Sequence, residues 1–396
     1  REDYRMMARF GVTTPCDFSG EPEDLPSCLE EAGAGLNIVF IRGLVPFRTV
    51  SGRDADAAEL EQFIRTSLAE GAIGVKCLGG HHPITPGTLQ RTIQIGHRLG
   101  VYVAVHVGST EHGSDIDGLE ELLGLAEGLP VHVAHVNSYC RGQQTGDPLE
   151  ECRRALAALR GAPLARSESY LSMLNGTGGA CIDGMPASEV TKTCLRMGGF
   201  ASTESGLGTA IRAGWASVWT TVGGETRLLA GAEGEQAWQD AGTQAGVSFP
   251  VNPPAAAVAL AVAKEPDGHF TIDALSTDGG GIPRNTIVEQ GLALVRFGAF
   301  SLPEFVRKAS SNGATMLGLT SKGHLGVGAD ADITVLDLER GRAVLSLVAG
   351  EVIMVDGLPV GRGGTILTTT AGEKSLRQKL AGRTSAIRVA PAIAGA

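Results

Sequence analysis

The order of strand-like and helix-like segments predicts an α/β fold, a (β/α)8 TIM barrel, for the first two-thirds of the 396-residue chain. Apolar strand patterns alternate with helical patterns in units of about thirty residues, as expected for parallel strands joined by crossover helices. Single ionisable residues stand in or at the end of successive strands, where barrel active sites collect. Neither a GxGxxG motif after a strand nor a GxxxxGK[ST] motif is present, which disfavours an open doubly wound sheet.

The individual elements follow from local pattern. The helix expected over residues 54–69 carries Leu60, Phe63, Ile64 and Leu68 at helical spacing. The other expected helices cover residues 1–10, 22–32, 86–99, 119–126, 148–159, 286–297 and 302–317. The expected parallel strands cover residues 12–18, 36–41, 73–78, 101–107, 131–136, 164–171 and 274–277.

Two further segments differ from the βα units in composition and periodicity. Residues 176–270 are rich in small residues with weak periodicity, and we expect helices and long loops inserted before the last barrel strand. Short strands separated by glycine-rich turns predict a small β appendage, at residues 331–336, 343–348 and 351–355. The expected division is a barrel over residues 1–318, a β-sandwich segment over 319–371, and a loosely packed tail over 372–396.

Composition narrows the function. A formal net charge of -10 argues against nucleic acid or an acidic membrane as partner and leaves a small-molecule substrate. The seven cysteines are dispersed without a CxxC pair, which predicts reduced thiols and a cytoplasmic location. No apolar run of membrane-spanning length and no signal peptide is visible in the sequence. Association of copies of the chain stays open.

Four residues stand out as candidates for chemistry because each lies in or at the end of an expected parallel strand: Lys76, His106, His135 and Asp278. The first three are separated by 30 and 29 positions, about one βα unit each, so they should lie at similar heights on successive strands. A lone strand histidine is more often a packed core residue, and Asp278 before small residues could simply cap a turn. The coincidence of all four favours a site.

Strand alternation indicates which way these side chains point. Val101, Val103, Val105 and Val107 share one face, suited to packing against helices, while Tyr102, Ala104 and His106 share the inward face. In the next strand His132 and His135 are expected on opposite faces, and the carboxyl end favours His135 for the site.

Imidazoles and a carboxylate suit zinc and neighbouring metals, and two metals can share a bridging hydroxide. A lysine becomes a ligand only after its neutral amine has reacted with carbon dioxide to give an anionic carbamate. That reaction requires a pKa lowered by burial or by nearby positive charge. The residue types therefore predict binuclear metal hydrolysis, with zinc or another divalent metal.

The motifs resemble the amidohydrolase superfamily, in particular its isoaspartyl dipeptidase, D-aminoacylase and dihydroorotase-like members. Gly74-Val-Lys-Cys is similar to a family strand-four lysine motif, and residues 322–333 are similar to the family's return to its β-sandwich. The resemblance implies Lys76 as the carboxylated bridging lysine, His106 and His135 as the strand-five and strand-six ligands, and Asp278 as metal ligand and general base.

One departure concerns the amino-terminal region. The family has an early strand ending in His-x-His, and no His-x-His occurs here; the first histidines are His81 and His82, after the lysine. The resemblance thus implies truncation upstream and a barrel lacking its first strand. D-aminoacylases use a cysteine as the bridging ligand, but the phrase match favours Lys76 over Cys77, which lies on the opposite face.

Substrate-binding candidates are His81, His82, Arg166, Tyr170 and Arg284. The two histidines follow a Gly-Gly turn at the mouth of the lysine strand and could instead face solvent. Arg166 or Tyr170 could bind a carboxylate or carbonyl oxygen, although an Arg166–Glu168 surface pair is an equally good interpretation. No GxSxG elbow supports a serine triad.

The expected function is metal-dependent hydrolysis of an amide C–N bond in an N-acyl amino acid, dipeptide-like or cyclic amide substrate. One alternative is a heterocycle deaminase of the same superfamily, against which Lys76 argues because most family deaminases use one metal and no bridging lysine. The other is an inactive, metal-free homologue, supported by the missing His-x-His.

Overall fold

The computed structural model describes residues 3–18, 20–222, 225–279, 281–381 and 385–389. At its centre is a six-stranded sheet in the order β14-β7-β6-β5-β4-β3, with every neighbouring pair parallel. This confirms the predicted parallel sheet. Its strands are β3 (Arg42–Leu44), β4 (Gly74–Leu78), β5 (Tyr102–His106), β6 (Val131–Val133), β7 (Ala165–Ser169) and β14 (Ala274–Leu275).

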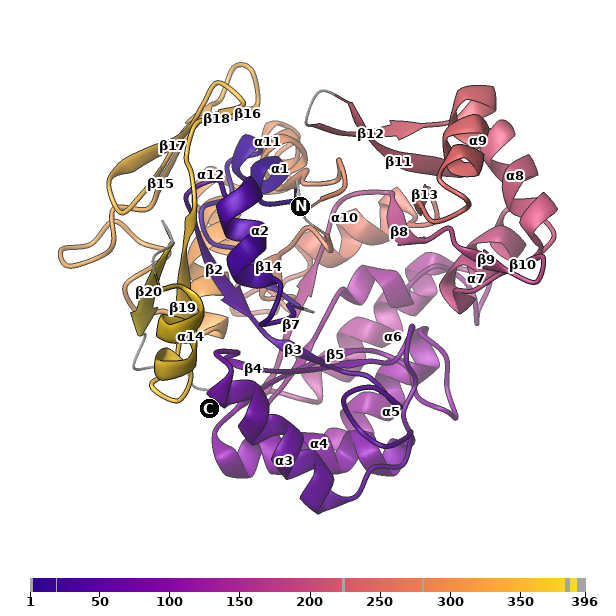
Figure 1. Cartoon of the computed structure of the whole chain (residues 1–396), viewed down its shortest axis with the longest axis horizontal. Helices are drawn as coiled ribbons and strands as arrows, with labels where there is room; N and C mark the ends of the chain where they lie inside the picture. The colour runs from indigo at the N-terminus through magenta and orange to yellow at the C-terminus, as the bar shows by residue number, and fades with distance from the viewer. Residues whose placement is uncertain (1–2, 19, 223–224, 280, 382–384, 390–396) are drawn as a thin grey trace.

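Helices that connect these strands cover the outer face of the sheet (Figure 1). They are α3 (Ala57–Ala69), α4 (Pro86–Leu99), α5 (Ile116–Ala126), α6 (Pro148–Arg160) and α10 (Pro254–Val262). Val103 and Val105 lie in this helix–sheet core, whereas Tyr102 and Ala104 belong to a separate inner cluster. Each fully buried aliphatic side chain contributes about 1.5–3 kcal/mol, so the alternation fixes which face of β5 turns inward.

A second parallel sheet continues the first. Its order is β1-β2-β19-β20, formed by β1 (Cys16–Asp17), β2 (Leu36–Phe40), β19 (Gly364–Thr368) and β20 (Ala386–Val389). Only Ile41 separates β2 from β3, so the chain passes directly from this sheet into the central one. Helices α1 (Asp3–Arg9) and α2 (Leu25–Ala32) lie beside it. Within the described ranges no strand joins β14 to β1, and the predicted barrel is therefore not closed.

The insertion between β7 and β14 contains a sheet that the sequence did not reveal. Four strands pair antiparallel in the order β12-β11-β13-β8, and a small hairpin joins β9 to β10. The strands are β8 (Asn175–Gly178), β9 (Cys181–Ile182), β10 (Met185–Pro186), β11 (Ser217–Val222), β12 (Glu225–Leu229) and β13 (Gly246–Phe249). The helices are α7 (Glu189–Met197), α8 (Glu204–Arg212) and α9 (Gly231–Asp240).

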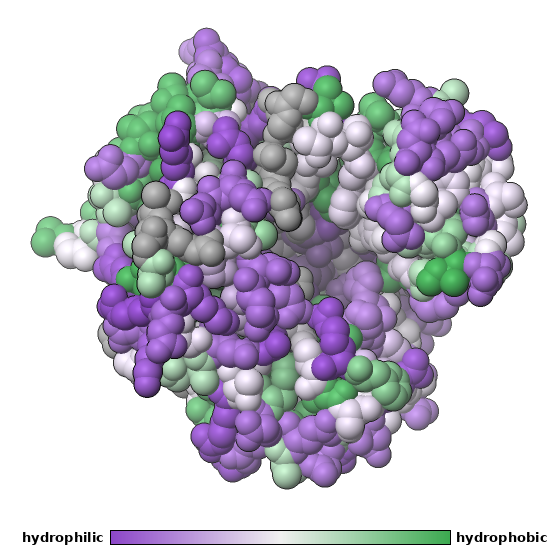
Figure 2. Space-filling model, in the orientation of Figure 1, coloured by the Kyte–Doolittle hydropathy of each residue, from purple (hydrophilic) through white to green (hydrophobic). Residues whose placement is uncertain are grey.

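This insertion forms its own lobe, with its own hydrophobic core. Figure 2 shows the molecular surface hollowed between this lobe and the rest of the chain. The expectation of helices and long loops was wrong for the four strands. β8 pairs with β13, which is distant in sequence, whereas β11 and β12 are consecutive in the chain and form a local hairpin.

The chain returns to the sheet through helices and then forms the predicted β appendage. The helical elements are α11 (Ile287–Arg296), α12 (Leu302–Val306), a π-helical turn (Arg307–Ser311) and α13 (Asn312–Met316). The appendage is an antiparallel sheet of β15 (Ile333–Asp337), β16 (Arg342–Val348), β17 (Glu351–Val355) and β18 (Leu358–Pro359). Its strands lie close to the predicted positions.

The tail is better ordered than expected. Helix α14 (Glu373–Lys379) buries Leu376 and Leu380 in the cluster that also contains β2, and β20 pairs with β19. The expectation of loose packing was therefore wrong for residues 373–381 and 385–389, since apolar residues at helical spacing in an Ala-rich, basic stretch were overlooked. The domain limits at residues 318 and 371 stay predictions.

Two observations bear on the environment of the chain. All seven cysteines are free thiols, in line with the predicted reduced state. In the part of the chain that the structure describes, no helix is both long and apolar enough to cross a bilayer.

Strand β14 is anchored at its amino end by a buried lysine. The Nζ of Lys308, in the π-helical turn, donates to the carbonyl oxygen of Ile272 at 2.6 Å and lies 4.2 Å from the centre of the Phe270 ring. Asn312 donates to the carbonyl oxygen of Asp273 at 2.7 Å. Burial lowers the pKa of Lys308 to about 7, while the charge of Asp273 acts in the opposite direction.

This shift predicts a pH-dependent stability. Above about pH 7 the folded chain releases the Lys308 proton, whereas the unfolded chain keeps it up to about pH 10.4, so the free energy of unfolding should rise with pH between these values. The contribution is at most about 1.4 kcal/mol per pH unit. Denaturant unfolding from about pH 7 to 9 should show this rise in the wild type and not in Lys308→Met. The exposed control Lys374→Met should follow the wild type; parallel profiles for all three would contradict the assignment.

Candidate active site

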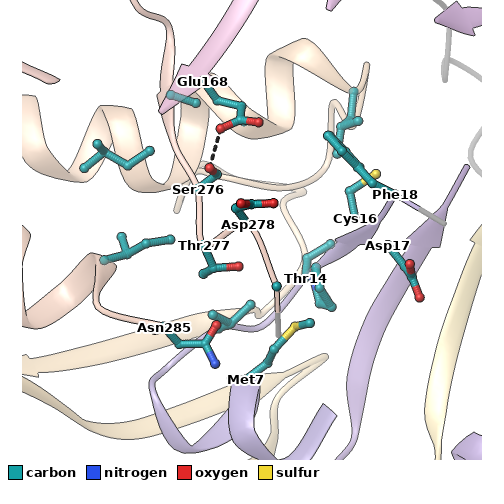
Figure 3. Close-up of a pocket in the computed structure, with 18 of the residues that line it drawn as sticks. Met7, Thr14, Cys16, Asp17, Phe18, Glu168, Ser276, Thr277, Asp278 and Asn285 are labelled. Carbon is teal, nitrogen blue, oxygen red and sulfur yellow. Dashed lines mark hydrogen bonds between the residues drawn. The ribbon is translucent and has the colours of Figure 1, made fainter. Parts of the chain in front are cut away.

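A cavity of about 1360 Å³ opens at the carboxyl ends of the parallel strands. Predicted site residues that line it are Lys76, His81, His82, His106, His135, Asp278 and Arg284. Figure 3 shows part of its wall, with Glu168, Ser276 and Asp278 grouped together. The structure therefore gathers most of the sequence-predicted residues in one place, as expected where parallel strands end at a common edge.

Lys76 points into this cavity from β4. Its neighbour Cys77 packs in the outer helix–sheet core, as strand alternation predicts. The Nζ atom lies 3.3 Å from His135 Nε2 and 4.6 Å from the centre of the Phe18 ring. Burial lowers the pKa of Lys76, and the charges of Asp278 and Glu168 act against that shift. Burial thus favours the neutral amine that carbamate formation requires.

His135 lies between Lys76, Asp278 and Glu168 in the cavity wall. Its Nε2 lies 3.1 Å from Asp278 Oδ1 and its Nδ1 lies 2.8 Å from Glu168 Oε1. Both ring nitrogens therefore face carboxylates from neighbouring strands. The residue follows β6 directly before a 3-10 turn (Val136–Tyr139) and has a left-handed backbone with φ of 57°.

The predicted alternation of His132 and His135 was wrong. His132 pairs in register with Ala104, an inward residue of β5, and lines the cavity. His135 lies beyond the end of β6, where the left-handed backbone turns its side chain back to the same cavity. Period-two alternation applies only while the strand continues, and β6 ends at Val133.

Asp278 follows β14 and faces the imidazole of His135 and the guanidinium of Arg284. Its Oδ1 contacts His135 and its Oδ2 lies 3.5 Å from the Arg284 guanidinium. Burial alone would raise the pKa of Asp278, but the charges of His135, Arg284 and Lys76 hold that pKa well below its usual range. The carboxylate is therefore ionised at neutral pH.

The backbone of Asp278 is also in the left-handed region, with φ of 47°. Left-handed non-glycine residues cost about 1–3 kcal/mol each when strongly strained, although Asp and His tolerate this region better than most. Finding two of them, His135 and Asp278, in direct contact is consistent with a functional site, where such conformations cluster.

His106 extends the group along the cavity. Its ring centre lies 5.7 Å from that of His135 and 5.6 Å from that of His81. Its Nε2 is 3.0 Å from the hydroxyl of Ser114. Burial, with the nearby charges of His81 and Lys76, holds the pKa of His106 well below its usual range, so its imidazole is neutral. A neutral imidazole is the form that binds metal ions.

Residues 258–362, which include Asp278 and Arg284, match the amidohydrolase family. The predicted resemblance to amidohydrolases is confirmed. No protein of curated function matches the sequence.

Several solved structures share the fold of this chain. An N-acyl-D-glutamate deacylase from Bordetella bronchiseptica, with zinc and a phosphonate inhibitor, matches with a TM-score of 0.64 at 15% identity, over 92% of this chain and 84% of its own. A formyltransferase/hydrolase complex from Methylorubrum extorquens, with methylofuran, gives 0.63 at 20% identity, over 98% and 82%. A D-hydantoinase gives 0.54 at 17% identity, over 94% and 84%. At these identities the likeness establishes the fold.

The amidohydrolase-like segment at residues 322–333 has a structural role. Lys322 is buried and forms ion pairs with Asp332 and, at 3.0 Å, with Asp330. Asp332 also accepts a hydrogen bond of 2.8 Å from Asn37 of β2. The stretch therefore anchors the β appendage to the sheet that carries β1 and β2.

Two predicted substrate-binding residues lie outside the cavity lining. Arg166 is the second residue of β7, near its amino end; its side chain is 52% exposed and lies 3.8 Å from Asp273. The hydroxyl of Tyr170 is held by Ser138 at 3.1 Å and by Asn252 at 2.8 Å, and its ring lies 5.6 Å from the Arg284 guanidinium carbon. Arg166 is therefore not brought to the site, and Tyr170 packs against Arg284 outside the cavity lining.

Arg284 is placed as a ligand-binding group would be. It is 5% exposed and lines the cavity, and one guanidinium nitrogen donates to the carbonyl oxygen of Leu174 at 3.2 Å. Its Nε has no hydrogen-bond partner among the described residues. A buried guanidinium with an unused donor beside Asp278 suits an incoming oxygen.

Sequence reasoning missed Glu168 as a site residue and treated it as the partner of Arg166 on the surface. Glu168 is 4% exposed, lines the cavity and contacts His135. It accepts a short hydrogen bond from Ser276 of the segment that follows β14. Burial alone would raise its pKa, but the charges of His135 and His132 lower it to about 2.

The spacing of these groups fits ligands of a metal ion. Two atoms bound to one tetrahedral ion lie about 3.4 Å apart when each bond is about 2.1 Å. The separation of His135 Nε2 from Asp278 Oδ1, 3.1 Å, is close to that value, and Lys76 Nζ, which would carry the carbamate oxygens, lies 3.3 Å from the same Nε2. Among the described residues no three His, Cys, Asp or Glu side chains alone are grouped tightly enough for an ion, so the fit depends on Lys76 as a ligand.

Proposed function

We propose that this chain hydrolyses an amide C–N bond with a divalent metal, zinc or a similar ion and preferably two, held by Lys76, His106, His135 and Asp278. The proposal is carried by His135, whose Nε2 lies within 3.3 Å of Lys76 and 3.1 Å of Asp278. When bound, the metal polarises the amide carbonyl and lowers the pKa of the attacking water. His135 and His106 supply imidazole nitrogens from one wall of the cavity, and the pKa of His106 is held well below its usual range by burial.

Lys76 takes part as a carbamate in this proposal. Its neutral amine attacks carbon dioxide, forms an N–C bond and releases a proton, which leaves an anionic carboxylate on the side chain. Burial lowers the pKa of Lys76 and supplies the neutral amine. The new anion would lie beside His135, where two oxygen atoms can hold metal ions that the amine itself cannot bind.

Asp278 moves the proton. Its ionised carboxylate accepts a proton from the attacking water and passes it to the leaving nitrogen as the tetrahedral carbon collapses. The two oxygens of this carboxylate have different neighbours: Oδ1 faces His135 and Oδ2 faces Arg284. Arg284 then donates to a carboxylate or carbonyl oxygen of the substrate, and His81 and His82 contact it at the cavity mouth.

The substrate class is an N-acyl amino acid, a dipeptide-like compound or a cyclic amide. The structural neighbours support this range, because they include a deacylase of an N-acyl-D-amino acid and hydantoinases. A small molecule fits the cavity of about 1360 Å³. A cytoplasmic location stays a prediction.

The first test combines metal content with turnover. The chain, supplied with zinc and bicarbonate, should bind zinc and hydrolyse members of a panel of N-acyl-D-amino acids, dipeptides and hydantoins. Asp278→Ala should lower kcat at least about 100-fold because it removes the proton acceptor, with circular dichroism unchanged. Asp267→Ala, at an exposed loop position before β14, is the control and should keep wild-type rates. Zinc-free protein without turnover would favour the inactive homologue, and turnover retained in Asp278→Ala would refute the general base.

The second test separates the two arginines. Arg284→Met should lower kcat/KM about 10- to 100-fold, since a charge-assisted hydrogen bond is worth about 1.5–3 kcal/mol. Arg166→Met should stay within about twofold of the wild type, because Arg166 lies outside the cavity lining. Steady-state kinetics on the best substrate of the panel measures both. Equal losses in the two variants would mean that Arg166 reaches the substrate and that the cavity is wrongly assigned.

A further inference from the structure

Glu168 contacts two separate segments at the base of the site. Its Oε1 accepts a hydrogen bond of 2.8 Å from the backbone N–H of His135 and lies 2.8 Å from the Nδ1 atom of the same residue. The other oxygen, Oε2, accepts a hydrogen bond from the Ser276 hydroxyl (Figure 3). His132 Nε2 lies 3.8 Å from Oε1. One buried carboxylate thus joins β7 to the end of β6 and to the segment after β14.

The contact with His135 decides how that ring is used. Oε1 lies 2.8 Å from Nδ1, which has no hydrogen-bond partner among the described residues, so Oε1 is the acceptor that a hydrogen on Nδ1 would use. With the hydrogen on Nδ1, the lone pair of Nε2 is left for a ligand. Nε2 is the atom that faces Lys76 and Asp278. The same carboxylate also holds the backbone N–H of His135, a residue in a left-handed conformation without a strand partner at this position.

The contact with Ser276 extends this control to Asp278. Ser276 lies two residues before Asp278, and its backbone N–H also donates to Ser169 of β7 at 2.9 Å. Main chain and side chain therefore fix the segment that leads to the general base. Glu168 is the common partner of both sides of the His135–Asp278 contact.

We infer that Glu168 is a positioning residue that sets the ring orientation and the Nδ1–H tautomer of His135, and thereby the affinity of the site for zinc. This inference rests on the proposed function. Loss of a carboxylate that supports a metal-binding histidine lowers metal affinity about 10- to 100-fold in general.

The test measures zinc affinity by competition with a chromophoric chelator in the full chain. Glu168→Gln keeps the shape and removes the charge, and its zinc Kd should rise about 10- to 100-fold. Ser276→Ala is the matched control, because it removes a different contact of the same carboxylate, leaves the contact with His135, and keeps the backbone hydrogen bond to Ser169 that holds the segment before Asp278; its Kd should rise less than about threefold. Circular dichroism and thermal unfolding check that each variant is folded.

Two further readouts separate positioning from general stability. Cobalt-loaded wild type and Glu168→Gln, compared at equal occupancy, should differ in visible absorption because the His135 donor has changed. Glu168→Asp keeps the charge but shortens the side chain by one methylene, so its zinc Kd should lie between those of the wild type and Glu168→Gln. If Glu168→Gln does not fold, Glu168→Asp replaces it in the comparison with the wild type.

The outcomes are distinct. A wild-type chain that binds no zinc would overturn the proposed function and this inference with it. A folded Glu168→Gln with the zinc Kd and cobalt spectrum of the wild type, or with the same change as Ser276→Ala, would overturn the positioning role of Glu168 and leave the proposed function standing.

Discussion

The site depends on the placement of one imidazole between two carboxylates. His135 contacts Glu168 through Nδ1 and Asp278 through Nε2, and each partner comes from a different strand of the parallel sheet. Buried carboxylates are unfavourable unless they are paired and hydrogen-bonded, so each of these contacts requires the other strands to be in register. The sheet, the anchoring of β14 by Lys308 and the left-handed turn at His135 all serve this arrangement.

Both carboxylates of the site have partners within the cavity. Asp278 contacts Arg284 and His135, Glu168 contacts His135 and Ser276, and the pKa values of both carboxyls are lowered despite burial. The same burial lowers the pKa of Lys76 and His106. One cavity thus holds ionised acids beside neutral bases, which is the combination that hydrolysis by a bound metal requires.

Much of this could be predicted from the sequence where strand periodicity holds. The inward Lys76 and outward Cys77, and the division of β5 into Val103 and Ala104 faces, follow from period-two alternation. His132, Glu168 and the sheet of the insertion did not follow. β6 ends at Val133, so the alternation does not extend to His135. Glu168 is hydrogen-bonded to Ser276, which lies more than one hundred residues later in the chain. β8 pairs with β13, which is also distant in sequence. Long-range pairing of this kind leaves no local pattern.

The most direct test of the account is a crystal structure of the chain grown with zinc, with anomalous diffraction recorded at the zinc edge. The account predicts an anomalous peak within about 2.0–2.2 Å of His135 Nε2 and an Asp278 oxygen, together with extra density on Lys76 for a carbamate. A zinc-free site in which His135 still contacts Asp278 directly, or zinc bound only at acidic groups elsewhere, would contradict it.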